Sequence, residues 1–154
     1  MQQRRFLTLF FLLLLFPCYA LAGNDPAPPG LTPITLPGGM IIYAELADTP
    51  LKRAEGLMYR ENLGADRGML FTFPQAQAWV FWMKNTKIPL DLIWINEKRQ
   101  IVHIEPNVPI CTRTDDSCPQ YRPNNDALYV LELAGGRAEG LKLQRGSKLQ
   151  FRVP

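Results

Sequence analysis

The stretch of sequence that decides the fold reads Val80-Phe81-Trp82-Met83-Lys84-Asn85-Thr86-Lys87-Ile88-Pro89-Leu90-Asp91. It places a polar cluster, Lys84-Asn85-Thr86, and the acidic Asp91 between two apolar segments that resemble strands. Polar groups in such surroundings need either a structural partner or a ligand. The stretch therefore indicates a β-rich fold and also a place to search for a binding site.

Short apolar or alternating segments continue on both sides, separated by turn residues. Thr49 and Pro50 are the cap and first-position residues of one short helix, expected to end near Tyr59. Residues 135–140 are expected to form a turn or a second short helix. We predict strands over residues 40–46, 68–73, 78–83, 91–95, 100–105, 127–133 and 148–153. This pattern favours a mainly β fold, a small antiparallel β-barrel or sandwich with one or two short helices.

The last predicted strand alternates strictly between apolar and polar residues. Because successive side chains of a strand point to opposite faces, one set should face the core and the other water. The inward set is Leu149, Phe151 and Val153, and the outward set is Lys148, Gln150 and Arg152.

The N-terminus has the three parts of a cleavable signal peptide. Arg4 and Arg5 precede an apolar run over residues 6–16, and Ala20-Leu21-Ala22 follows it. The run is shorter than the roughly 20 residues that a membrane-spanning helix needs. We expect cleavage after Ala22, export to the periplasm or medium, and no membrane span afterwards. An uncleaved anchor, or a lipoprotein acylated at Cys18, are the alternatives.

Cleavage after Ala22 divides the chain into a signal peptide (residues 1–22), a leader rich in Pro and Gly (23–39) and one β-rich domain (40–154). Loss of Arg4 and Arg5 lowers the formal net charge from +3 to +1. Such near-neutrality argues against nucleic acid as a partner. We expect a monomer without a cofactor.

Two cysteines remain in the mature chain, Cys111 and Cys118. In an oxidising compartment this pair predicts a disulfide that closes a short polar loop. A redox or metal site is the alternative, although the spacing is wider than Cys-x-x-Cys and no His lies nearby.

Four motifs resemble, in the same order, those of the "domain of unknown function 192" family. They are Gly56-Leu57-Met58-Tyr59-Arg60, Gly68-Met69-Leu70-Phe71-Thr72-Phe73, Phe81-Trp82-Met83-Lys84-Asn85-Thr86 with Ile88-Pro89-Leu90-Asp91, and Tyr129-Val130-Leu131-Glu132-Leu133. The resemblance covers residues 40–153 and implies a small mainly β domain, often exported. It implies no reaction, because the family has no established activity.

The third motif supplies our candidate ligand-binding residues. Lys84 and Asn85 are expected to donate hydrogen bonds to a ligand and Asp91 to accept them, while Trp82 offers a ring for stacking. In the alternative interpretation Asn85 and Thr86 cap a turn, Asp91 pairs with Lys84 or Arg60, and Trp82 belongs to the core.

Arg60 is a further candidate, because an arginine held by packing can bind a carboxylate or phosphate with two hydrogen bonds. An ion pair with the adjacent Glu61 is the more common outcome and is the one we expect. Proximity of Arg60 to Lys84 would favour an anionic ligand.

Other chemistries have weaker support. Met58, Met69 and Met83 could bind Cu(I), but methionine is also a common core residue. The only histidine, His103, cannot build a His-based metal cluster by itself, and no Gly-x-Ser-x-Gly motif is present. Asp91, Glu105 and Glu132 could form the carboxylate pair of a glycoside hydrolase.

The sequence thus favours an exported β domain that binds a small ligand or an envelope component without catalysis. The alternatives are a saccharide hydrolase that uses a carboxylate pair, and a protein-interaction module centred on the irregular segment 106–126.

Overall fold

A computed structural model describes residues 27–113 and 115–154. The predicted signal peptide lies outside the described residues. The elements are, in chain order, β1 (Thr32–Thr35), β2 (Ile41–Ala47), α1 (Pro50–Glu55), β3 (Arg67–Gln77), β4 (Phe81–Trp82), β5 (Leu90–Ile95), β6 (Ile101–Val108), β7 (Gln120–Tyr121), β8 (Ala127–Ala134) and α2 (Arg137–Gly140). The mainly β class with two short helices is confirmed.

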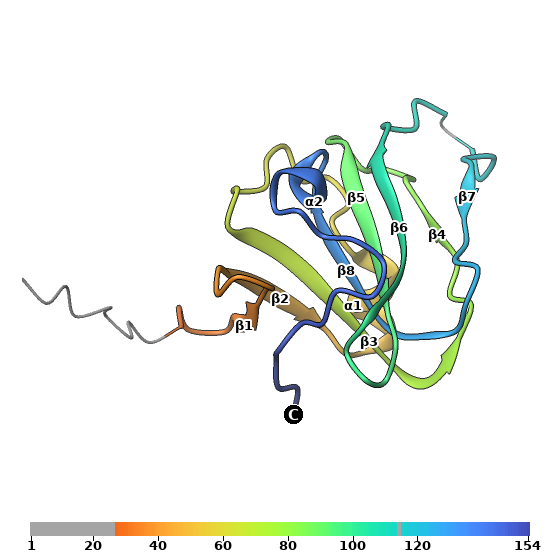
Figure 1. The fold of residues 1–154 in the computed structure, drawn as a ribbon. Helices are drawn as coiled ribbons and strands as arrows, with labels where there is room; N and C mark the ends of the chain where they lie inside the picture. Colours follow the sequence, from red (N-terminus) through yellow and green to blue (C-terminus); the bar gives the residue numbers. More distant parts are fainter. Residues whose placement is uncertain (1–26, 114) are drawn as a thin grey trace, which may run out of the picture.

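Six strands form one curved sheet in the order β1-β2-β3-β8-β5-β6, and β4 pairs with β7 in a small second sheet to one side (Figure 1). Every neighbouring pair in the large sheet is antiparallel except β2 and β3, which run parallel. The connection between these two contains α1, as a parallel pair requires a crossover.

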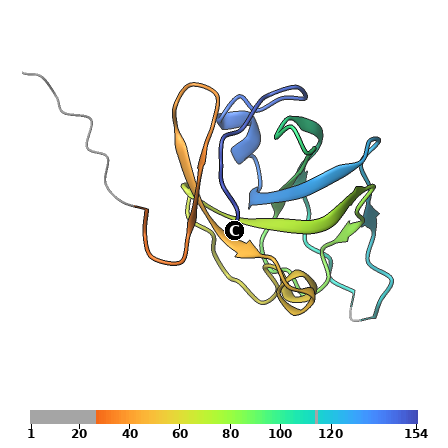
Figure 2. The same cartoon turned by 90° about the horizontal axis from the view of Figure 1, so that it is seen from below.

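The C-terminal segment joins the two edge strands. Isolated bridges connect Gln100 with Lys148 and Thr35 with Gln150, so residues 148–150 contact both the β6 edge and the β1 edge. Figure 2 shows this segment (dark blue) beside the β1–β2 hairpin (orange). Leu149 and Phe151 are buried whereas Lys148, Gln150 and Arg152 are exposed, which confirms the predicted alternation although no continuous strand forms.

The large sheet buries both of its faces. Ile93 and Leu131 belong to one apolar cluster, and their chain neighbours Leu92 and Val130 belong to the other. A strand covered on both sides carries apolar residues at nearly every position, and all six positions of β5 are buried. The polar exceptions in these strands, Asp91 and Glu132, therefore sit in a dry environment.

Three sequence-based boundaries differ from the structure. β1 lies inside the predicted leader, and Ile34 and Leu36 are core residues, so the folded domain begins before residue 40. The helix ends at Glu55 rather than near Tyr59, and Leu51 is 78% exposed. β3 continues through Pro74 with a register shift between Thr72 and Gln77, because proline lacks the N–H that a regular ladder needs. Among the described residues, no helix is long and apolar enough to cross a membrane.

Candidate functional site

A small cavity of about 40 Å³ lies where the end of α1, β3, β8 and the segment after β4 meet. We name it the Glu132 cavity. It is lined by Arg53, Ala54, Glu55, Gly56, Leu57, Met58, Phe71, Phe81, Trp82, Lys84, Thr86 and Glu132. Each of the four sequence motifs contributes at least one of these residues.

Two glycines shape this region. Gly56 ends α1 with φ 51°, and its N–H donates to the carbonyl of Lys52 at 2.8 Å. A Cβ at Gly56 would lie 3.2 Å from Cζ of Phe71, so a larger residue would crowd the cavity wall. A Cβ at Gly68 would lie 2.7 Å from the backbone oxygen of Glu132. Glycine therefore permits β3 and β8 to approach closely at the level of the buried acid.

Glu132 is the buried polar group of the cavity. Its residue is 5% exposed, and Oε2 has no hydrogen-bond partner among the described residues. Its neighbours across the ladder are Met69 on β3 and Leu92 on β5. Burial raises the pKa of Glu132 to about 8, because the charged form loses its hydration. At neutral pH the side chain therefore holds its proton and can donate a hydrogen bond.

Glu132 was expected only as a candidate member of a carboxylate pair and not as a ligand-binding residue. The available signal was a single acid within the apolar segment Tyr129–Leu133. A glutamate with apolar neighbours on both sides in a doubly buried strand must face the interior, where an unpaired carboxyl group is costly.

Trp82 and Lys84, both predicted site residues, lie together at this cavity. Nζ of Lys84 lies 5.2 Å from the centroid of the Trp82 ring, which is a cation–π distance. Trp82 is 36% exposed, so part of its ring faces solvent. Lys84 also forms an ion pair with Asp116 of the loop that contains the disulfide.

Asn85, the third predicted residue of this motif, forms hydrogen bonds that connect the loop after β4 with the segment after α1. Nδ2 of Asn85 donates to the hydroxyl of Tyr59 at 2.9 Å. The backbone carbonyl of Asn85 accepts from the backbone N–H of Tyr59 at 2.8 Å. Asn85 has φ 56°, a left-handed conformation that asparagine adopts more readily than most residues. It supports the loop that carries Lys84 and does not line the cavity.

Asp91 lies apart from the cavity. The residue is 0% exposed, and three backbone N–H groups donate to its carboxylate. Asn107 and Gly136 donate to Oδ1 at 2.7 Å and 2.9 Å, and Ala138 donates to Oδ2 at 2.6 Å. Since α2 begins after a glycine that has no capping side chain, Asp91 caps this helix from β5. It pairs with neither Lys84 nor Arg60.

Arg60 also lies away from the cavity and does not pair with Glu61, so that expectation is wrong. Its guanidinium donates two hydrogen bonds to Glu45, at 2.9 Å and 2.7 Å, and these raise the pKa of Arg60. Glu61 pairs with Lys87 at 3.0 Å instead. Long side chains can reach acids from other elements, so sequence adjacency did not decide the partner.

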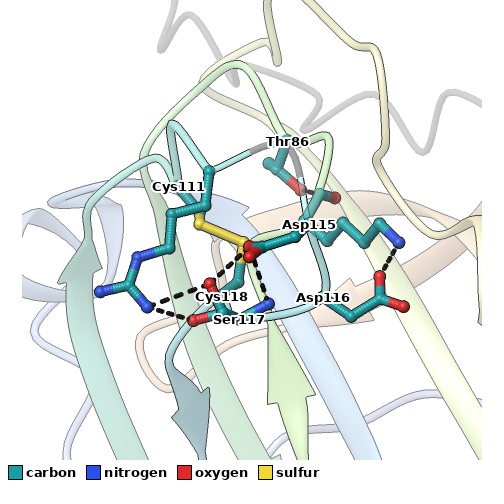
Figure 3. The surroundings of a disulfide bond; sticks show 8 residues. Thr86, Cys111, Asp115, Asp116, Ser117 and Cys118 are labelled. Carbon is teal, nitrogen blue, oxygen red and sulfur yellow. Dashed lines mark hydrogen bonds and ion pairs between the residues drawn. A yellow bond between two sulfur atoms is a disulfide. The ribbon is translucent and has the colours of Figure 1, made fainter.

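The predicted disulfide between Cys111 and Cys118 is present, with 5.9 Å between the two Cα atoms. Figure 3 shows Asp115, Asp116 and Ser117 within the closed loop, with Thr86 nearby. The hydroxyl and N–H of Ser117 both donate to Asp115, and these bonds lower the pKa of Asp115. The loop thereby presents Asp116 toward the Lys84 side of the cavity.

The remaining candidates do not form a second site. Met69 and Met83 are core residues, whereas Met58 lines the cavity. Nε2 of His103 lies 3.6 Å from Oε2 of Glu105 on the same strand. Within residues 27–113 and 115–154, no group of three His, Cys, Asp or Glu residues is arranged to hold a metal ion.

Comparison with known proteins places the chain in a family. The profile of domain of unknown function 192, described as "Uncharacterized ACR", matches residues 34–151. The chain belongs to this family. A UPF0127 protein of Thermococcus gammatolerans is 28% identical over 116 residues, which cover 72% of this chain and 67% of the relative.

Two solved structures are similar to this domain of unknown function 192 protein. A Novosphingobium aromaticivorans protein of unknown function has a TM-score of 0.72 and 31% identity, covering 84% of this chain and 94% of its own. A Sinorhizobium meliloti protein, named as a candidate transcription regulator, has a TM-score of 0.67 and 30% identity, covering 84% and 98%. The fold is thus found in at least two solved relatives.

Proposed function

We propose that the domain binds a small ligand at the Glu132 cavity without catalysis, and that a neutral polar group of the ligand enters the cavity. One observation carries the proposal. Four motifs that are separated along the chain each supply a residue to this cavity, and its buried acid has an oxygen without a partner. Buried polar groups are normally paired, so an unpaired one at a cavity is an expected place for a ligand group.

The cavity limits what can enter. Its volume of about 40 Å³ exceeds the roughly 10–15 Å³ that a cavity needs to hold one water molecule, and it lies far below the several hundred Å³ of a typical small-molecule site. Only a small group such as a hydroxyl or an amide end fits, while the rest of the ligand would lie outside against Trp82. Since Glu132 is protonated at neutral pH, its O–H can donate to an oxygen of that group. A sugar hydroxyl with the ring stacked on Trp82 meets both requirements.

Binding fits the geometry better than glycoside hydrolysis does. Asp91 pairs with Leu133 and Leu92 pairs with Glu132 across β5 and β8, so the two acids point to opposite faces of the sheet. Glu105 shares a face with Glu132, but the buried Leu92 stands between them in the register. Neither of the two acids expected to pair with Glu132, Asp91 and Glu105, therefore lines its cavity, and the second acid there is Glu55 at the end of α1.

Export forms part of the proposal. The N-terminal sequence has the composition of a signal peptide, and the Cys111–Cys118 disulfide suits an oxidising compartment. We expect the mature protein in the periplasm or medium, where envelope saccharides are available. Fractionation with immunodetection tests this location, and full-length protein in the cytosol alone would contradict it.

Native mass spectrometry of the protein purified from its own envelope tests the binding proposal. We expect a retained mass that Glu132→Leu, which removes the hydrogen-bond donor, and Trp82→Ala reduce at least tenfold in occupancy. Glu139→Leu, which makes the same change at an exposed acid on α2, is the matched control and should retain the adduct. Equal occupancy in Glu132→Leu and the wild type, or no adduct in any sample, would refute the proposal.

The pH dependence of binding defines the ligand group. A ligand that accepts a hydrogen bond from protonated Glu132 should bind more weakly at pH 9 than at pH 6, because the carboxyl group ionises near pH 8. A ligand with an ammonium group should instead bind more tightly at pH 9 than at pH 6. That result would mean that the group in the cavity is a cation and not a neutral polar group.

A further inference from the structure

A second concavity lies far along the sheet from the Glu132 cavity, at the end where the C-terminal segment contacts the edge strands. Its volume is about 480 Å³, within the range of small-molecule sites. It is lined by Pro33 of β1, by Arg99 of the turn between β5 and β6, and by residues 148–152. It shares no residue with the Glu132 cavity.

The charge of this groove has one sign. Arg99, Lys148 and Arg152 line it, and no acidic residue does. In the described part of the chain, the ion pairs formed involve other cations, so none of these three is neutralised by a carboxylate. The concentration of positive charge contrasts with the near-neutral composition of the domain. An anion in this groove would be attracted by three cations and would meet no acidic side chain in the lining.

Arg99 is held firmly. It has φ 59°, its N–H donates to the carbonyl of Asn96 at 2.9 Å, and its carbonyl accepts from the N–H of Leu149 at 2.9 Å. Its guanidinium carbon lies 5.2 Å from the centroid of the Phe151 ring. Nε of Arg99 is buried and has no hydrogen-bond partner in the described structure. A buried donor without a partner requires an explanation, and an anion bound in the groove would supply one.

Lys148 and Arg152 are presented from an anchored backbone. Gln150 exchanges hydrogen bonds with Thr35 at 2.8 Å and 2.9 Å, while the bridge to Gln100 holds Lys148. Because their positions differ by four in an extended segment, both side chains leave the same face, roughly 13 Å apart along the backbone. Together with Arg99 they can surround a ligand that carries more than one negative oxygen.

We infer that this groove, the Arg99 groove, binds a phosphate-bearing ligand, either a soluble phosphorylated compound or the headgroup of an anionic phospholipid. Arginine presents a planar fork that matches phosphate oxygens, and lysine adds a point charge. The inference does not depend on the Glu132 cavity, because the two sites have no residue in common.

Calorimetric titration with pyrophosphate at constant ionic strength tests the inference. We expect saturable binding to the wild type and at least a tenfold loss of affinity in Lys148→Gln/Arg152→Gln, whose two positions are exposed. Arg122→Gln/Lys142→Gln removes two other exposed cations and is the matched control, which should bind like the wild type. Arg99→Lys keeps the charge and should still lose affinity, because the planar fork is lost.

Two further arms distinguish the sources of phosphate. Sedimentation with phosphatidylglycerol vesicles that depends on Lys148 and Arg152 would assign a lipid headgroup, and pyrophosphate binding without sedimentation would assign a soluble ligand. Equal weakening in the groove and control variants, or no binding to either probe, would overturn the inference. Tighter binding of duplex DNA than of pyrophosphate would also overturn it in favour of nucleic acid.

Discussion

Asp91 on β5 and Glu132 on β8 are buried acids of the same sheet, and they differ in what surrounds their oxygens. Three backbone N–H groups meet the carboxylate of Asp91, whereas Oε2 of Glu132 meets none. The first acid accepts hydrogen bonds from the start of α2 and from Asn107 of β6. The second belongs to a residue that lines a cavity, and one of its oxygens has no hydrogen-bond partner in the described structure. Burial alone therefore does not distinguish a structural acid from a candidate site acid. The two differ in the number of hydrogen-bond partners of their carboxyl oxygens.

Asp91→Ala should have the largest effect on stability. It leaves three buried N–H groups without an acceptor, which we expect to cost about 4 kcal/mol or more in the free energy of unfolding. Urea denaturation at pH 7 measures this loss. A loss below about 1 kcal/mol would remove the distinction between the two acids.

Glu132→Gln should instead stabilise the protein at high pH. The ordinary pKa of 4.5 applies to the unfolded chain, whereas the folded protein holds the proton to about pH 8. The contribution of Glu132 to stability is thus fully present below about pH 4.5 and is lost as the pH rises to about 8. Glutamine cannot ionise, so the variant should exceed the wild type at pH 8 by on the order of a few kcal/mol. Melts of both proteins at pH 5 and pH 8 compare them, and parallel pH profiles would contradict the assignment.

Removal of the disulfide tests the loop that presents Asp116 to Lys84. Cys111→Ser/Cys118→Ser opens a ring of eight residues, which should cost about 2 kcal/mol through the entropy of the unfolded chain. Guanidinium denaturation measures it. If ligand occupancy falls with the disulfide while Asp116→Asn has no effect, the loop acts by its shape and not by its charge.

The smallest effects should separate Asn85 from Lys84 within one motif. Asn85→Ala loses the bond to Tyr59 and places alanine at φ 56°, so a loss of about 1 kcal/mol is expected. Lys84→Ala removes a partly exposed ion pair with Asp116 and the cation–π contact with Trp82, and it should cost less stability than Asn85→Ala. Thermal melts of the two variants measure the difference in stability. Equal losses of stability would indicate that Lys84 has a structural role like that of Asn85.

Sequence patterns predicted the strands well where apolar periodicity was clear. The alternation of Leu149 and Phe151 with Lys148 and Gln150 predicted the correct buried face, and the strands expected over residues 91–95 and 100–105 correspond to β5 and β6. The strand expected over residues 68–73 stops one residue before Pro74, whereas β3 continues to Gln77 because an irregularity in the ladder accommodates a residue that cannot pair. β1 was not predicted, because a four-residue strand among prolines and glycines is too short to show a clear alternation of apolar and polar residues.

The candidate site could be predicted only in part. Trp82 and Lys84 were found because they interrupt or end an apolar segment, and this signal is local. The positions of Asp91 and Glu132 depend on which face each strand presents and on the N–H groups that distant turns supply. Such partners lie about 45 residues along the chain from Asp91, so no local pattern contains them.

The bridges at Lys148 and Gln150 also affect how the domain folds during its synthesis. Strands at both edges of the sheet obtain part of their pairing only from residues 148–150. Before that part of the nascent polypeptide emerges, Thr35 and Gln100 expose backbone groups that can recruit other chains. The domain therefore completes its fold only after nearly all of it has been synthesised, and the preceding intermediate is the species most prone to aggregate.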